Sequence, residues 1–142
     1  MGNLRTSPFR KQHDGILEII AIILNILDPE TIKNNSHGIR KQITKLAGVV
    51  KVHLVLEDNS LYPVLANNEN RVLKETSAQF MEEMGSISNS FNAYLEKWST
   101  VSSIKSETRL FITETQSLLD SLKSRIEREN DSFYKLIDEI LE

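Results

Sequence analysis

The stretch His53-Leu54-Val55-Leu56-Glu57-Asp58-Asn59-Ser60-Leu61-Tyr62-Pro63 closes a segment of helical periodicity that begins at Ile39. In that segment apolar residues recur at alternating spacings of three and four, which is the pattern of a helix face packed on a core. His53 and Glu57 fall on this face, four residues apart, so both side chains are expected to point into the core. The stretch therefore predicts a helix over 39–61 that carries two ionisable groups on its buried side.

The same periodicity continues on both sides of this helix and predicts three more helices. Ser7 and Pro8 can start a helix that runs to about Leu27, because serine caps helices and proline is tolerated in the first turn. Turn-forming clusters at 34–38 and 67–70 and a polar connection at 99–106 separate helices expected over 39–61, 71–98 and 107–140. Four helices joined by short links predict an all-α, up-down-up-down four-helix bundle.

The composition is typical of a single domain over 1–142, in which we expect 1–6 to be a flexible N-terminus. The 142 residues are 39% apolar and 26% charged, which is an ordinary globular balance. A net charge of −3 leaves no basic surplus for phosphates, so we expect no nucleic-acid partner. The chain has no cysteine, which excludes disulfides, thiolate metal ligands and a cysteine nucleophile.

The N-terminal region predicts a cytoplasmic chain. It has no apolar core ahead of a cleavage site, so we expect no secretory signal. The apolar run 16–27 is interrupted by Glu18 and Asn25 and is shorter than the ~20 residues of a membrane span, which predicts a buried helix and no membrane partner. Gly2 and Thr6 match the pattern for N-myristoylation, which is short and recurs by chance.

Each predicted helix carries at least one ionisable side chain on its core-facing stripe. These residues are His13 in the first helix, His53 and Glu57 in the second, Glu83 in the third and Glu129 in the fourth. In an alternating bundle these residues lie at about the same level along the bundle axis, because each helix rises by ~1.5 Å per residue. Two imidazoles and three carboxylates are thus expected to meet in the interior. On the third helix, whose predicted stripe includes Val72, Glu83 and Phe91, a change of phase by one residue would exchange Glu83 for Glu82.

Buried carboxylates need positive charge, because burying them without partners is costly. Arg125, four residues before Glu129 on the same face, can neutralise one of them. A divalent metal ion can neutralise the others, since histidine nitrogen combined with carboxylate oxygen suits iron, manganese or zinc. The alternative is that the histidines are satisfied by neighbouring carboxylates and that Glu129 pairs with Arg125 without a metal.

Residues 53–63 resemble the helix-2 signature H-L-x-x-E-D-x-x-L-Y-P of the hemerythrin-like (HHE cation-binding) domains. Residues 11–16 are similar to the helix-1 histidine segment of that family, and residues 125–134 are similar to its helix-4 acidic segment. The resemblance extends over nearly the whole chain. It implies a hemerythrin-like bundle around non-haem iron, with His13 and His53 on one ion and with Glu57 and Glu129 as bridging carboxylates.

The chain departs from that family where a second ion would bind. The segment that resembles the family's helix-3 His-x-x-x-His is 79–83, from Gln79 to Glu83, and Arg125 occupies the helix-4 histidine position. Arginine does not ligate a metal at neutral pH. The resemblance leaves one or two ions open, with Glu83 replacing a histidine in the second case. Gln79 and Arg125 are expected to hold carboxylates from behind the ligands.

These features predict a non-haem iron-binding protein whose ligands are His13, His53, Glu57, Glu83 and Glu129. The loss of histidines argues against reversible oxygen transport and favours sensing or handling of redox state, oxygen, nitric oxide or iron. Dioxygen, another small diatomic molecule or a peroxide would then be its partner. One alternative is a di-iron oxidative enzyme of a peroxidase- or ferroxidase-like kind. Another is a metal-free helical-bundle interaction module.

Overall fold

The computed structural model describes residues 6–141, which form helices and turns without a β-strand. The long helices are α1 (Ser7–Asn25), α3 (Ser36–Leu56), α5 (Arg71–Lys97) and α7 (Thr108–Arg128), and the shorter ones are α2 (Pro29–Asn34), α4 (Tyr62–Ala66), α6 (Val101–Ser106) and α8 (Tyr134–Leu141). Two π-helical segments, η2 (Glu57–Leu61) and η3 (Glu129–Phe133), continue α3 and α7. The all-helical class predicted from the sequence is confirmed. Within this range no helix is both long and apolar enough to cross a membrane.

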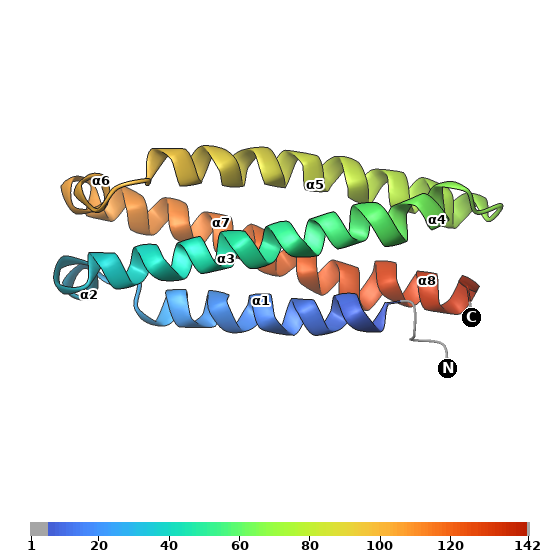
Figure 1. The fold of residues 1–142 in the computed structure, drawn as a ribbon, viewed down its shortest axis with the longest axis horizontal. Coiled ribbons are helices and arrows are strands. Elements are labelled where there is room, and N and C mark those ends of the chain that lie inside the picture. The colour runs from blue at the N-terminus through green and yellow to red at the C-terminus, as the bar shows by residue number, and fades with distance from the viewer. Residues whose placement is uncertain (1–5, 142) are drawn as a thin grey trace.

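The long helices α1, α3, α5 and α7 lie side by side (Figure 1). α3 continues through η2 into α4, and α7 continues through η3 into α8. α2 and α6 lie at one end of the molecule, and α4 lies at the other end near α8 (Figure 1). The start of α1, the end of α3, the start of α5 and the end of α7 therefore belong to the same half of the molecule.

Helix α1 begins at Ser7 with Pro8 in its first turn, close to the predicted start. Its N-cap is Thr6, whose hydroxyl does not cap the helix but donates to Oδ1 of Asp138 in α8 at 2.8 Å. Thr6 was expected in the flexible N-terminus, whereas the structure buries it completely. The rest of that expectation, and Gly2 of the lipidation pattern, lie outside the described residues.

Two connections that the sequence predicted as turns or loops contain short helices. Asp28 accepts a hydrogen bond from the Thr31 amide at 2.9 Å and so caps α2. Thr100 accepts a hydrogen bond from the Ser103 amide at 3.1 Å and so caps α6. Capping side chains at these positions satisfy amides of the first turn, which favours short helices in polar sequence.

The π-helical segment η2 forms the end of the predicted helix 39–61, which continues into α4, and η3 interrupts the predicted helix 107–140. Each segment begins with a buried glutamate, Glu57 or Glu129, and is followed by a buried tyrosine, Tyr62 or Tyr134. A π-helical turn contains more residues than an α-helical one, so it changes which side chains face inward beyond it. Such segments are frequent at functional sites.

The ionisable residues lie between two apolar clusters of the interior. Along α1, Phe9 belongs to the smaller cluster and Ile16 to the larger one, and His13 lies between them. Along α7 and η3, Ile126 of the larger cluster and Phe133 of the smaller cluster flank Glu129 in the same way. The buried histidines and carboxylates therefore form a polar layer with apolar packing on both sides.

The first half of α5 is rotated relative to its predicted orientation. Leu73 is fully buried, whereas Val72, which was predicted to face the core, is 61% exposed. In the second half of the helix the predicted position Phe91 is buried, and so is Trp98, the residue that follows the helix as its C-cap. The first half has few large apolar residues at a regular spacing, so the helical periodicity defines its inward face less well.

Candidate metal centre

The polar layer takes its side chains from three helices and their π-helical extensions. His13 lies on α1, His53 lies in the last turn of α3, and Glu57 is the first residue of η2. Arg125 lies in the last turn of α7, and Glu129 is the first residue of η3. All five residues are at most 4% exposed. The structure thus brings together four of the five predicted ligands.

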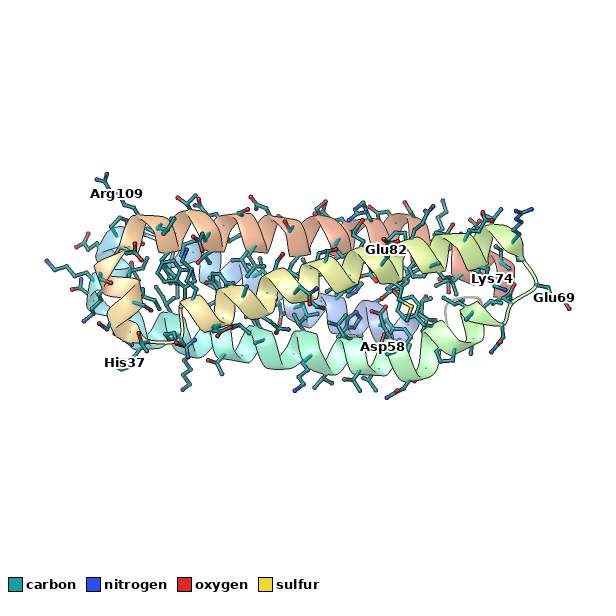
Figure 2. All side chains as sticks on the ribbon, turned by 90° about the horizontal axis from the view of Figure 1, so that it is seen from above. His37, Asp58, Glu69, Lys74, Glu82 and Arg109 are labelled. Carbon is teal, nitrogen blue, oxygen red and sulfur yellow. The ribbon has the colours of Figure 1, made fainter. Side chains whose placement is uncertain are left out.

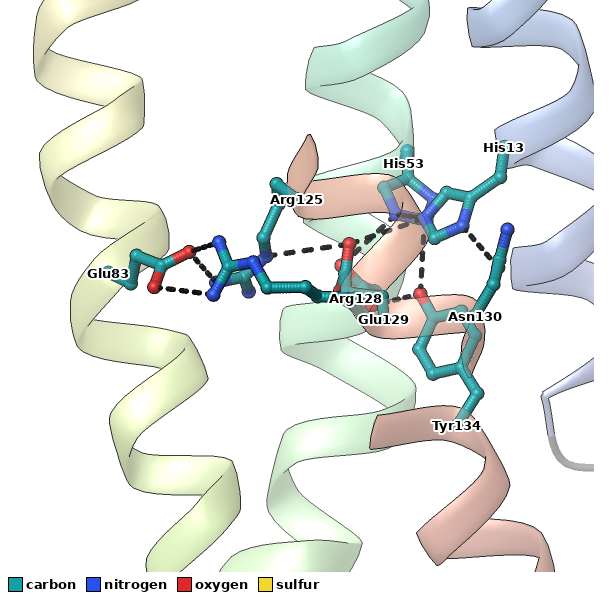
Figure 3. A network of polar contacts seen from close by, with 9 residues as sticks. His13, His53, Glu83, Arg125, Arg128, Glu129, Asn130 and Tyr134 are labelled. Carbon is teal, nitrogen blue, oxygen red and sulfur yellow. Dashed lines mark hydrogen bonds and ion pairs between the residues drawn. The ribbon is translucent and has the colours of Figure 1, made fainter. Parts of the chain in front are cut away.

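His13, His53 and Glu129 lie close enough to share one metal ion (Figure 3). Nε2 of His13 is 3.1 Å from Nε2 of His53 and 3.4 Å from Oε1 of Glu129. One ligand atom from each of these residues lies within 4.8 Å of the other two. Two imidazole nitrogens and a carboxylate oxygen are ligands that iron, zinc and manganese accept.

Amide side chains behind the two imidazoles determine where each ring is protonated. Nδ1 of His13 donates to Oδ1 of Asn130 at 2.8 Å, and Nδ1 of His53 donates to Oε1 of Gln12 at 2.6 Å. In a neutral ring, a proton on Nδ1 leaves the lone pair on Nε2. The two Nε2 atoms then face each other with lone pairs, so they need a proton or a metal ion between them. Metal-binding histidines are commonly oriented by a hydrogen bond of this kind.

Glu57 contacts His53 and is held by Tyr134. Oε1 of Glu57 is 3.1 Å from Nε2 of His53, and Oε2 accepts a hydrogen bond from the Tyr134 hydroxyl at 2.6 Å. Burial alone raises the pKa of Glu57, but the hydrogen bond and the electrostatic effect of His53, together with the hydrogen bond from Tyr134, outweigh burial and lower this pKa. Burial and the nearby carboxylates raise the pKa of Tyr134, so its hydroxyl remains a neutral donor.

We expect Tyr134→Phe to lower the free energy of unfolding of the metal-free protein by about 1–3 kcal/mol, because Oε2 of buried Glu57 would lose its donor. Tyr62→Phe is a matched control, since Tyr62 is also buried and its hydroxyl has no hydrogen-bond partner within residues 6–141. Urea denaturation measures both variants. Equal losses of stability in the two variants would contradict the role assigned to Tyr134.

Arg125 supplies buried positive charge beside Glu129. Its Nε is 3.5 Å from Oε1 of Glu129, and its Nη1 donates to Oε1 of Glu83 at 3.2 Å. The guanidinium also lies over the ring of Phe80, 4.6 Å from the ring centre. Oε2 of Glu129 is buried and has no hydrogen-bond partner in the described part of the chain. A bound cation would satisfy this oxygen, so the donor set fits a metal ion.

Glu83, which was predicted as a ligand, is not brought to this group. Its side chain is 39% exposed and forms ion pairs with Arg125 and Arg128. The hydrogen bond from Arg128 lowers the pKa of Glu83 against the effect of burial, and Arg125 adds to this effect. Glu83 is therefore an ionised carboxylate that two arginines already satisfy.

The rotation of α5 explains this difference from the predicted site. Gln79 and Glu82 are exposed, so neither lies behind the ligands. Met84 instead faces inward and lines a small cavity at the histidines. Glu83, one residue earlier in the helix, cannot point in the same direction as Met84, since successive residues differ by ~100° around the helix axis.

The cavity at the site has a volume of about 20 Å³. A volume of this size holds about one water-sized particle. His13, His53, Arg125 and Glu129 line it, together with the apolar side chains Ile16, Val50, Leu54, Met84, Leu122 and Ile126. The cavity therefore has room for one metal ion within reach of the candidate ligands.

Gln12, Asn130 and Tyr134 were not among the residues predicted from the sequence, although each bonds to a candidate ligand. One signal for Tyr134 is a repeated spacing, because in both places a tyrosine lies five residues after the glutamate that begins the π-helical segment. The matching segments are His53-x3-Glu57-x4-Tyr62 and Arg125-x3-Glu129-x4-Tyr134, with Phe9-x3-His13 and Phe80-x3-Met84 as a second matching pair. The second half of the chain thus has methionine and arginine where the first half has two histidines.

Comparison with known proteins points to the same kind of site. A family model described as the hemerythrin HHE cation binding domain matches residues 6–137. No curated protein and no solved structure matches the chain. The matched range includes every residue of the candidate metal centre.

Proposed function

Because the chain belongs to the hemerythrin HHE cation-binding domain family, we propose that it binds one non-haem iron ion through His13, His53 and Glu129. Glu57 is the fourth ligand in this proposal, since its Oε1 is 3.1 Å from the Nε2 of His53 that would bind the ion. Membership of the family implies a metal ion. The identity of the metal, the number of ions and the role of the site are proposed here from the geometry.

The observation that carries the proposal is the pair of Nε2 atoms 3.1 Å apart. Asn130 and Gln12 each accept a hydrogen bond from an Nδ1–H group, so the lone pair of each ring lies on Nε2 and both lone pairs point to one place. Glu129 adds a buried carboxylate oxygen that has no partner in residues 6–141. Three such donors around a cavity of about 20 Å³ support a metal ion over a simple ion pair.

The ligand types favour iron. Two histidines and one carboxylate with open positions are typical of non-haem Fe(II) centres, and Glu57 adds a second carboxylate to such a set here. Zinc and manganese accept the same donors and are the alternatives to test. Bound iron would supply redox chemistry and positions for a small ligand, while the chain binds the ion, orients the imidazoles through Gln12 and Asn130 and limits the access of water.

Arg125 supports one ion rather than two. Its guanidinium lies beside Glu129. In this half of the site Met84 and Arg125 have the positions that His13 and His53 have in the other half. A fixed positive charge there repels a second cation and replaces its charge. Reversible oxygen transport is an activity that the family resemblance brings to mind, and it uses two ions whose ligands are mostly histidines. The site therefore favours sensing or handling of redox state, oxygen, nitric oxide or iron, and it disfavours a di-iron oxidative enzyme.

We also propose the up-down-up-down four-helix bundle as the topology around this site. The alternating directions of α1, α3, α5 and α7 support it (Figure 1). Contacts of α1 with α3 and α7, and of α5 with α7, agree with this arrangement. In helical bundles, metal sites are built from inward-facing side chains on facing helices.

Elemental analysis of protein purified without added metal or chelator tests the proposal. We expect about one iron per chain, and a chelator should lower the melting temperature, because an ion that binds only the folded state stabilises it. Reloading with iron should restore the melting temperature. Two ions per chain would contradict a single-ion site, and zinc would contradict iron. A chain that remains metal-free after reconstitution would favour the interaction module.

A further inference from the structure

Arg125 has N–H donors that no described residue accepts. The residue is 1% exposed, and its Nη1 donates to Glu83. Neither Nε nor Nη2 has a hydrogen-bond partner within residues 6–141, although Nε lies 3.5 Å from Oε1 of Glu129. A buried donor without an acceptor is unfavourable, and more so on a charged group. A ligand that accepts a hydrogen bond here would remove this cost.

These donors lie at the candidate metal centre. Arg125 lines the same small cavity as His13, His53 and Glu129. The guanidinium lies between Glu83 and the two histidines (Figure 3). A small molecule that enters the cavity beside the metal ligands is therefore within reach of Arg125.

A groove between α3 and α5 lies next to this cavity and shares three lining residues with it. The groove has a volume of about 510 Å³. Val50, Leu54 and Met84 line both the groove and the cavity. Methionine is unbranched and adapts its shape, so a movement of Met84 can join the two spaces. The inner cavity holds about one water-sized particle, the space assigned above to the metal ion, so a small ligand beside the ion would occupy the space that a movement of Met84 opens.

The charges at the site favour a negatively charged ligand. Glu57 and Glu129 carry two negative charges, whereas a divalent ion and Arg125 together carry three positive charges. Glu83 does not change this balance, because it also pairs with Arg128. One positive charge remains in a buried place, where unbalanced charge is costly. A monoanion would neutralise it.

We propose that Arg125 holds a small monoanion beside the metal ion and so selects anionic ligands over neutral ones. This inference rests on the metal site proposed above. Arg125 provides charge-assisted hydrogen bonds, which are stronger than those between neutral groups. The ligand class is a monoanion of a few non-hydrogen atoms, and azide is a suitable probe because it is linear, small and singly charged.

Azide titrations of the metal-loaded protein test the role of Arg125. Arg125→Met removes the charge and the donors from a long side chain, and Arg125→Lys keeps the charge but loses the planar set of donors. We expect the azide Kd to rise about 10- to 100-fold in Arg125→Met and by a smaller factor in Arg125→Lys. The affinity for nitric oxide, a neutral probe, should change by less than about threefold in both variants.

Metal content, measured in the same samples, separates this inference from the metal site itself. A wild-type chain without metal would overturn both. A metal-loaded Arg125→Met variant with unchanged azide affinity would overturn only the role of Arg125, and so would equal losses for azide and nitric oxide. If Arg125→Met does not fold or load, Arg125→Lys decides, and unchanged azide affinity in that variant overturns the inference.

Discussion

Replacement of His53 by alanine should abolish metal binding by the chain. Nε2 of His53 lies 3.1 Å from Nε2 of His13 and 3.1 Å from Oε1 of Glu57, which places it at the centre of the proposed site. Loss of a residue behind a metal ligand lowers metal affinity about 10- to 100-fold, and loss of the ligand itself should lower it further. Elemental analysis after dialysis should therefore find less than about a tenth of the wild-type metal content in His53→Ala.

His37→Ala is the matched control for this substitution. His37 is exposed and lies at the end of the molecule that holds α2 and α6, away from the site (Figures 1 and 2). Glu83→Ala is a second control, because it removes the carboxylate that the sequence predicted as a ligand and the structure places with Arg125 and Arg128. Both controls should retain metal. Metal retained by His53→Ala, or lost by His37→Ala, would contradict the proposed site.

The same substitution should remove the effect of metal on stability. An ion present at 100 times its Kd adds about 2.7 kcal/mol to the free energy of unfolding. Wild-type protein should therefore unfold at a higher denaturant concentration with iron than with a chelator. His53→Ala should unfold at the same concentration in both conditions. A metal-dependent shift that persists in the variant would mean that the ion binds elsewhere.

Much of the fold could be predicted because its signals are local. Pro8 lies in the first turn of α1, and Asn70 caps α5 by accepting a hydrogen bond from the Leu73 amide at 3.0 Å. Such signals act within one turn of a helix, so they can be recognised without knowledge of the packing. The six-residue helices α2 and α6 were not predicted, since six residues show too little periodicity to define a helix face.

The same reasoning explains which candidate ligands the sequence could identify. His13, His53 and Glu129 lie between regularly spaced apolar residues, which fix the inward face of α1, α3 and α7. Glu83 lies in the part of α5 that lacks such spacing. The inward face of this part is shifted by one residue from its predicted position, so Met84 faces inward in place of Glu83. The orientation of a side chain can be predicted only as well as the apolar stripe of its own helix is defined.

The residues that hold the ligands depend on packing between helices. Gln12 is 41 residues from His53, and Asn130 is 117 residues from His13. No local pattern predicts these contacts, because they require the relative rotation and height of two helices. They nevertheless determine where each imidazole is protonated and hence which nitrogen is free to bind a metal ion.

The two halves of the site share positions but differ in ligands. Gln12 accepts a hydrogen bond from His53 at 2.6 Å, and Glu83, at the equivalent place in α5, accepts one from Arg125 at 3.2 Å. Asp58 follows Glu57 as Asn130 follows Glu129, and Asp58 and Met84 both line the groove between α3 and α5. Glu83 and Asp58 therefore have the positions from which two further imidazoles, at 125 and 84, would be hydrogen-bonded.

Met84→His combined with Arg125→His should accordingly raise the metal content from about one ion per chain to about two, because it supplies two imidazoles and removes the charge that repels a second cation. Glu57 and Glu129 would supply carboxylate ligands. Elemental analysis of the reconstituted variant measures this gain. Met84→His alone is the control and should still bind one ion, since Arg125 remains. A folded double variant that binds one ion would show that Arg125 is not what excludes the second metal from this site.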